Sequence, residues 1–153
     1  MVETEKSAGF IVFRIENGIR KYLLLYKPAS EQYRESRGFP KGLIEKGEND
    51  LATARRETEE EAGIKDLKVI PSFKEKVHFF YKREGKLISK DVIYFLGQTE
   101  QEKAKVSYEH KDYEWLTFDQ AIQKLTSKSD KEVFQKAEEF MKKPRSDLSK
   151  FIK

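Results

Sequence analysis

The order of predicted elements indicates an α/β fold in which a β-sheet has helices packed on its faces. Two observations support this prediction: apolar runs alternate with turn signals along most of the chain, and three segments have helix caps or helical periodicity. At 153 residues the chain has room for one core and not for a second domain of ordinary size. We therefore expect a single domain over residues 1–153, in which residues 143–153 form a frayed end or a short docked extension.

The first predicted elements are two paired strands. Residues 8–15 (AGFIVFRI) and residues 21–27 (KYLLLYK) are mostly apolar, and the Glu-Asn-Gly sequence at residues 16–18 between them is typical of a turn. Residues 28–40 have no sustained period, so a loop is predicted there.

A helix and several strands are predicted next. Asn49 or Asp50 can cap a helix that ends near Ala62, because Gly63 is a common helix stop. Strand-like composition then recurs in short segments, with a plausible hairpin turn at residues 83–86. These predicted strands are residues 66–70, 73–81, 91–98 and 113–116.

Two helices are predicted near the C-terminus. Thr117 with Gln120, and Ser129 with Glu132, each match the capping-box pattern that opens a helix. In the second helix the apolar residues recur at helical spacing and are expected to face the core, namely Val133, Phe134, Ala137, Phe140 and Met141.

Composition limits the chemistry of any metal site. The chain has no cysteine and only two histidines, His78 and His110, which argues against thiolate or histidine-rich sites. Oxygen ligands remain, and they favour Mg²⁺ or Mn²⁺. The net charge of +4 comes from 31 basic and 27 acidic side chains mixed along the chain, which favours a solvated surface over a nucleic-acid interface. Residues 1–10 contain no long apolar run, so we expect no secretory signal, no membrane partner and a cytoplasmic location.

Residues 42–64, GLIEKGENDLATARRETEEEAGI, contain charged residues and glycines at fixed spacing. Residues three and four apart share a helix face, so Glu57, Glu60 and Glu61 should lie close together. Their repulsion favours the binding of divalent cations, which can bridge phosphate oxygens and polarise phosphorus. An acidic run is usually a solvated face by itself, but seven spaced positions argue against that alternative: Gly42, Glu48, Arg56, Glu57, Glu60, Glu61 and Gly63.

This spacing is that of the Nudix box, and the chain resembles the Nudix hydrolases. The resemblance implies the Nudix fold, a mixed central β-sheet sandwiched between helices. It also implies that Glu57 and Glu61 bind metal, that Gly42 offers its carbonyl, and that Glu60 is a further ligand or the base that deprotonates water. Arg56 would hold these glutamates by ion pairs, so the catalytic candidates are Glu60, Glu57 and Arg56.

Two further positions of the box have structural roles in the family. Glu48 and Glu60 are the partners available to Arg56 here, although an Arg56–Glu60 pair by itself is an ordinary helix ion pair. Gly63 would end the helix. Thr58 stands where the box usually has an aliphatic residue, and its methyl group can still pack.

Four segments are similar, in sequence and order, to the asymmetrical diadenosine tetraphosphate hydrolases: GFPKG, ARRETEEEAGI, SKDVIYFL and SYEHKDYEWL. The resemblance implies that Lys41 and Lys90 contact phosphates. It also implies that Tyr94 and one aromatic residue among positions 79–81, of which we choose Tyr81, line the nucleotide pocket. Core packing is the alternative for each of these aromatic side chains.

The last of these segments implies three more site residues. Glu109 would be a metal ligand from a separate loop, and His110 and Tyr113 would lie near the substrate. Leu43 stands where this branch usually has histidine, which leaves the choice of substrate open.

The resemblance implies metal-dependent cleavage of diadenosine tetraphosphate to ATP and AMP, with Mg²⁺ or Mn²⁺ as the cofactor, and we expect a monomer. The alternatives are a Nudix pyrophosphohydrolase acting on nucleoside triphosphates, RNA 5′ ends or diphosphoinositol polyphosphates, and a non-catalytic module that binds nucleotide or RNA. We expect no nucleic-acid partner other than an RNA 5′ end bound as substrate.

Overall fold

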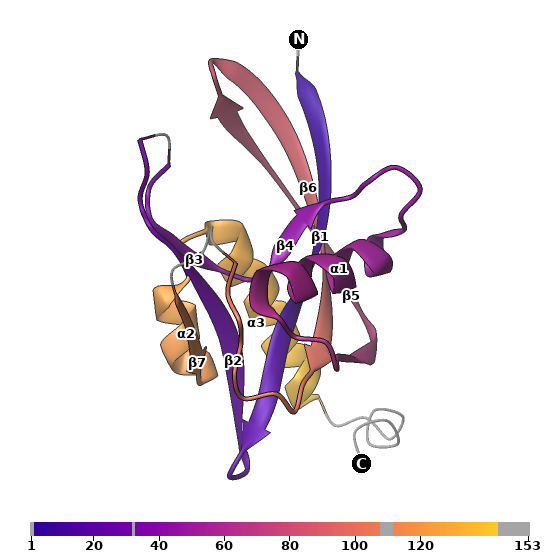
Figure 1. Cartoon of the computed structure of the whole chain (residues 1–153), viewed down its shortest axis with the longest axis vertical. Helices are drawn as coiled ribbons and strands as arrows, with labels where there is room; N and C mark the ends of the chain where they lie inside the picture. The colour runs from indigo at the N-terminus through magenta and orange to yellow at the C-terminus, as the bar shows by residue number, and fades with distance from the viewer. Residues whose placement is uncertain (1, 32, 108–111, 144–153) are drawn as a thin grey trace.

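The computed structural model describes residues 2–31, 33–107 and 112–143 of the chain. Within these ranges it contains one seven-stranded sheet and three helices (Figure 1). In chain order the elements are β1 (Glu3–Glu16), β2 (Ile19–Lys27), β3 (Ser36–Gly38), β4 (Lys41–Leu43), α1 (Asp50–Ala62), β5 (Lys68–Arg83), β6 (Lys86–Gln98), β7 (Asp112–Leu116), α2 (Phe118–Lys124) and α3 (Lys128–Lys142).

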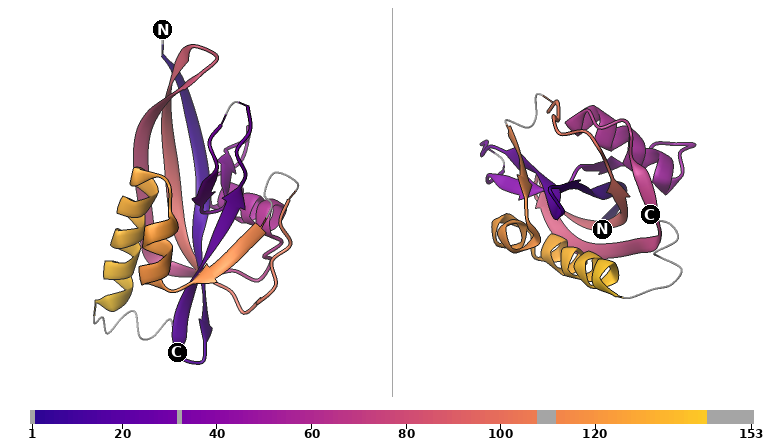
Figure 2. Two further views of the ribbon diagram at one scale, coloured as in Figure 1. Left: turned by 90° about the vertical axis from the view of Figure 1, so that its left-hand side faces the viewer. Right: turned by 90° about the horizontal axis from the view of Figure 1, so that it is seen from below.

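The sheet is mixed. Its main path runs β3-β2-β1-β6-β5, while β4 pairs with β1 and β7 pairs with β2. The pairing of β1 with β6 is parallel, and the other pairings are antiparallel. At one end of the molecule β1 and the β5–β6 hairpin extend beyond the other elements (Figures 1 and 2).

Helices cover both faces of the sheet, which confirms the predicted sandwich. Helix α1 packs on β1, β4 and β6, while α2 and α3 pack on the other face, against β2 and β5 (Figure 2). Along β1 the side chains alternate between two cores: Phe10 and Val12 face α1, whereas Ile11 and Phe13 face α3. Burial on both faces explains why residues 8–13 of this strand are an almost continuous apolar run.

Both predicted hairpins are confirmed. Asn17 and Gly18 adopt positive φ between β1 and β2, and Glu84 and Gly85 do so between β5 and β6. The loop predicted at residues 28–40 is only partly correct, because its end forms β3 on the edge of β2.

Several predicted elements differ from the structure. Strands β1 and β6 each begin five residues earlier than predicted, at Glu3 and Lys86. Residues 41–43 form a strand, β4, that was not predicted. The two strands predicted at 66–70 and 73–81 are one strand, β5, with an irregularity between Val69 and Lys74 where Ser72 has a φ of 71°. Helix α3 is capped by Ser127, whose hydroxyl accepts from the N–H of Asp130, and not by Ser129.

The core-facing prediction for α3 is confirmed: Val133, Phe134, Ala137 and Phe140 are buried and Met141 packs beside them. No helix in the described part of the chain combines the length and the apolar character needed to cross a bilayer.

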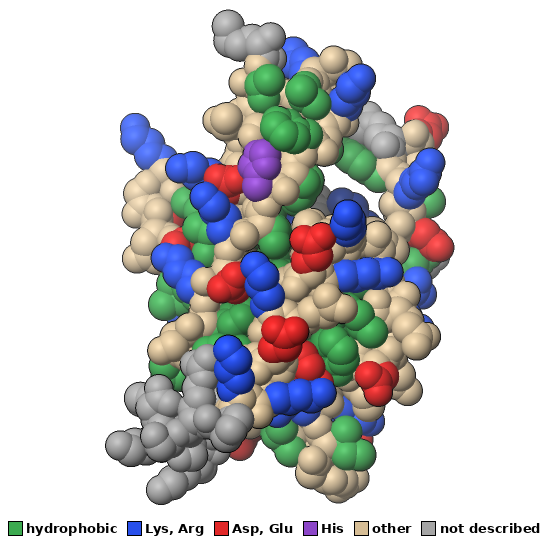
Figure 3. All heavy atoms as spheres, turned by 180° about the vertical axis from the view of Figure 1, so that it is seen from behind, with side chains coloured by type: hydrophobic (Ala, Val, Ile, Leu, Met, Phe, Trp, Pro, Cys, Tyr) green, Lys and Arg blue, Asp and Glu red, His purple; other side chains and the backbone are tan. Residues whose placement is uncertain are grey.

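The surface carries charges of both signs. On the face opposite to that of Figure 1, lysine and arginine side chains are interspersed with aspartate and glutamate (Figure 3). This mixing agrees with the predicted solvated surface.

Candidate active site

Helix α1 carries the acidic candidate residues, and its sequence explains why it forms. The Asn49 side chain accepts a hydrogen bond from Ala52 N at 2.8 Å, and Gly63 ends the helix with a φ of 67°. The predicted cap and stop are therefore confirmed. The buried face of α1 consists of small residues that allow close packing on the sheet: Thr53, Ala54, Thr58 and Ala62.

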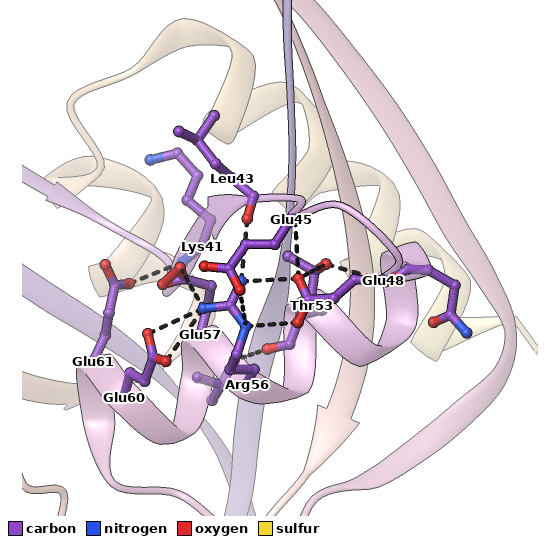
Figure 4. A network of polar contacts seen from close by, with 12 residues as sticks. Lys41, Leu43, Glu45, Glu48, Thr53, Arg56, Glu57, Glu60 and Glu61 are labelled. Carbon is purple, nitrogen blue, oxygen red and sulfur yellow. Dashed lines mark hydrogen bonds and ion pairs between the residues drawn. The ribbon is translucent and has the colours of Figure 1, made fainter.

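Arg56 is the centre of a polar network on the exposed side of α1 (Figure 4). Its Nε and Nη2 donate to the two carboxylate oxygens of Glu48 at 2.7 and 3.0 Å. Its Nη1 lies 3.2 Å from both oxygens of Glu60 and 3.3 Å from Glu57 Oε2, and its Nη2 also donates to Leu43 O at 3.2 Å. Both expected partners, Glu48 and Glu60, therefore contact Arg56. Because Arg56 also contacts Glu57 and Leu43 O, its Glu60 contact is part of a network and not an isolated helix ion pair.

Glu48 is the fixed end of this network. Besides Arg56, it accepts from Thr53 Oγ1 at 2.8 Å and from Glu45 N at 3.0 Å. The hydrogen bond from Arg56 is the main cause that lowers the pKa of Glu48 to about 2, and the same bond raises the pKa of Arg56. Both groups are charged at neutral pH, so Glu48 holds the guanidinium beside the carboxylates of α1.

Strand β4 brings backbone groups to the same carboxylates. A Cβ added at Gly42 would lie 1.9 Å from Glu57 Oε2, so only glycine lets this carboxylate lie against the strand. Next to it, Lys41 N donates to Glu61 Oε1 at 3.0 Å. The short strand therefore fixes the positions of two of the three acidic side chains.

These groups line a cavity of about 730 Å³. Glu57, Glu60 and Glu61 contribute to its wall from α1, as predicted for residues on one helix face. Cationic side chains come from three strands, namely Lys27 of β2, Lys41 of β4 and Lys90 of β6. A cavity with acidic and basic walls can bind a polyphosphate together with the cations that bridge it to the acids.

The donors in this cavity fit a hard divalent cation. The described part of the cavity offers carboxylate and backbone oxygens and neither sulfur nor imidazole. Among the described residues, no three acidic or histidine side chains are grouped closely enough to hold an ion as they stand. Arg56 contacts Glu57 and Glu60, and Glu61 accepts from Lys41 N, so their role as ligands remains a prediction.

Comparison with known proteins identifies the family. A model described as the NUDIX domain matches residues 5–137. The chain belongs to the Nudix family. The asymmetrical bis(5′-nucleosyl)-tetraphosphatase of Sus scrofa is 34% identical over 146 residues, which cover 89% of this chain and 95% of that protein. The solved Ap4A hydrolase of Caenorhabditis elegans, in a binary complex, has a TM-score of 0.77 and 28% identity, covering 90% of this chain and 97% of that chain.

A third relative matches a shorter part of this Nudix chain. The mRNA-decapping protein g5R of African swine fever virus is 48% identical over 61 residues, which cover 39% of this chain and 23% of that protein. Nudix hydrolases generally need divalent metal ions.

Of the predicted substrate-binding residues of this Nudix domain, Lys41 and Lys90 line the cavity. Tyr94 does not: it is fully buried in the core on the α3 side of the sheet, and its hydroxyl donates to Asp130 Oδ1 at 2.8 Å. The prediction that it lines the nucleotide pocket was wrong, because Tyr94 lies further along the same face of β6 than Lys90, where α3 covers it, and the sequence of β6 does not show how far that cover extends. Burial also raises the pKa of Tyr94 well above its usual value.

Two other aromatic residues do not line the cavity in this Nudix structure. The Tyr81 hydroxyl donates to Glu5 Oε1 at 2.6 Å, and the Tyr113 ring packs beside the core under α1. The predicted ligand Glu109 and the predicted substrate neighbour His110 lie outside the described residues.

Sequence reasoning missed several groups in the cavity wall. Lys27 is the principal one, together with Ser7, Ser36 and Ser107. Lys27 directly follows the apolar run of β2, and a cation at the end of a predicted strand was the available signal.

Proposed function

We propose that this chain hydrolyses diadenosine tetraphosphate asymmetrically to ATP and AMP, with Mg²⁺ as the cofactor and Mn²⁺ as a substitute. The observation that carries the proposal is the cavity in which carboxylates of α1 share the wall with lysines of three strands. The similarity to named asymmetrical tetraphosphatases, over 89% of the chain in the case of the pig protein, supports this substrate.

In this proposal the box residues divide into binding and positioning groups. Glu57, Glu61 and the Gly42 carbonyl would hold the metal, and Glu60 is a further ligand or the base. Bound Mg²⁺ would polarise the phosphorus under attack and neutralise phosphate charge. Arg56 touches Glu57 and Glu60, so it sets the directions of both carboxylates.

The proposed reaction is the displacement of one nucleotide by water. With Glu60 as the base, its carboxylate takes a proton from water, and the water oxygen forms a bond to a phosphorus of the bridge. The bridging P–O bond breaks, and its oxygen leaves with the other product. Lys27, Lys41 and Lys90 would bind the phosphate oxygens and reduce the negative charge that the bound chain brings.

Chromatography of the products tests this proposal. Incubation with diadenosine tetraphosphate and Mg²⁺ should give ATP and AMP in equal amounts, and excess chelator should stop the reaction. Formation of two ADP, or no turnover with Mg²⁺, would contradict the proposal.

A substrate panel separates the alternatives. It should include nucleoside triphosphates, diphosphoinositol polyphosphates and capped RNA, because a viral relative of 48% local identity is named as an mRNA-decapping protein. Higher kcat/KM for any of these would replace the proposed substrate. Binding without any product would instead indicate a non-catalytic module.

We also propose that the protein acts as a monomer in the cytoplasm. Light scattering during size-exclusion chromatography tests the assembly state, and fractionation of cells tests the location.

A further inference from the structure

Glu5 is a largely buried acid beside the cavity that has no role in the proposed reaction. Strands β1 and β6 run parallel and place Glu5 opposite Lys90 in register. Lys90 Nζ lies 3.3 Å from Glu5 Oε1, and the two side chains keep 14% and 13% of their surface exposed. A lysine of the cavity wall is therefore paired with an acid on the neighbouring strand.

Two donors on β5 fix the position of Glu5. The Tyr81 hydroxyl donates to Glu5 Oε1 at 2.6 Å, and Arg83 Nη1 donates to Glu5 Oε2 at 2.9 Å. The hydrogen bond from Tyr81 is the main cause that lowers the pKa of Glu5. The carboxylate is therefore an anion at neutral pH, held by donors of β5 that reach it across β6, the strand that carries Lys90.

Lys90 needs this anion because its surroundings otherwise oppose a positive charge. Burial lowers the pKa of Lys90, and the nearby cations Lys41 on β4 and Arg83 on β5 act in the same direction. Glu5 is the charged neighbour that acts against them. A neutral amine would lose the charge through which Lys90 attracts phosphate.

We propose that Glu5 is a positioning residue that keeps Lys90 charged and directed along the cavity wall, with Tyr81 and Arg83 holding Glu5 in place. The inference rests on the proposed function, because Lys90 matters only for a substrate that carries phosphate. It also gives Tyr81 a different role from base stacking, since its hydroxyl is bonded to Glu5.

The Glu5→Gln variant tests the inference, because glutamine keeps the size and removes the charge. We expect kcat/KM for diadenosine tetraphosphate to fall about two- to fivefold more at alkaline pH than at neutral pH, the range typical of one ion pair. Glu3→Gln is the matched control. Glu3 lies on the same strand and pairs with Arg83 and Lys86, so this variant should keep the wild-type pH profile.

Two further measurements distinguish a charge effect from a general loss of structure. In a Lys90→Arg background, Glu5→Gln should no longer change the alkaline part of the profile, because a guanidinium stays protonated. An equal loss at every pH, or the same loss in Glu3→Gln, would overturn the inference.

The second measurement does not need turnover. In protein with ¹³C-labelled lysine, the Cε signal of Lys90 can be assigned by its loss in Lys90→Arg and followed during a pH titration. Glu5→Gln should move its titration to lower pH, and an unchanged titration would overturn the inference. If the wild type cleaves no dinucleoside polyphosphate, only the proposed function fails, and this titration still tests the role of Glu5.

Discussion

Replacing Gly42 by alanine tests whether the position of Glu57 controls activity. The added Cβ would lie 1.9 Å from Glu57 Oε2, 2.0 Å from its Cδ and 2.5 Å from its Oε1. All three atoms belong to the end of a flexible side chain, so the glutamate can rotate away while β4 stays in place. Gly42 is not among the glycines with positive φ, so alanine fits the backbone there.

The size of the effect follows from this overlap. An ordinary contact between these atoms needs about 3.4 Å, so the carboxylate must retreat by about 1.5 Å. A misplacement of about 1 Å in a catalytic group can reduce the rate by about 100-fold. We therefore expect kcat/KM to fall by about 100-fold, which corresponds to about 2.7 kcal/mol of transition-state stabilisation.

The assay combines steady-state kinetics with thermal unfolding. Gly42→Ala should lose activity and keep its Tm, whereas Gly18→Ala should show the opposite pattern. Gly18 has a φ of 78° and no atom near its added Cβ, so alanine there costs about 1 kcal/mol of stability without reaching the cavity. Wild-type kinetics in Gly42→Ala would refute the reasoning, and so would a loss of activity explained entirely by unfolding.

Two more predictions concern the acids around Arg56. Glu60→Gln should lower kcat by about 10²- to 10⁴-fold while the circular dichroism spectrum stays unchanged, and unaltered turnover would remove Glu60 from the mechanism. Glu48→Gln should change the acid stability. The pKa of Glu48 is lowered from 4.5 to about 2 in the folded protein. The ionised Glu48 therefore stabilises the fold fully above pH 4.5, and this stabilisation is lost as the pH falls toward 2. Between these pH values the urea midpoint of the wild type should fall more steeply than that of Glu48→Gln, and parallel curves would contradict this.

The sequence predicted correctly the features that depend on neighbouring residues. The Asn49 cap and the Gly63 stop of α1 depend on neighbouring residues, and so does the turn at Asn17-Gly18. The spacing of the box likewise placed Glu57, Glu60 and Glu61 on one helix face.

The sequence did not predict the features that depend on contacts between residues far apart in the chain. Strand β4 is only three residues long and exists because it pairs with β1, which local propensity does not reveal. Tyr94 and Lys90 lie on the same face of β6, four residues apart, yet Tyr94 is buried against α3 and Lys90 lines the cavity. Only the position of α3 along the strand decides which of them is covered. The cap of α3 is Ser127 and not the predicted Ser129, because the helix begins two residues earlier, directly after α2 and a short connection.

The parallel pairing of β1 with β6 has a consequence for the order of folding. Glu5 and Lys90 are partners 85 positions apart, so the central strand leaves the ribosome long before its neighbour has been translated. Until then one edge of β1 stays open to other chains, while β2 and β4 can already pair with parts of the opposite edge. The edge of the central strand that β6 will cover is therefore the part of the nascent chain most open to pairing with another chain during synthesis.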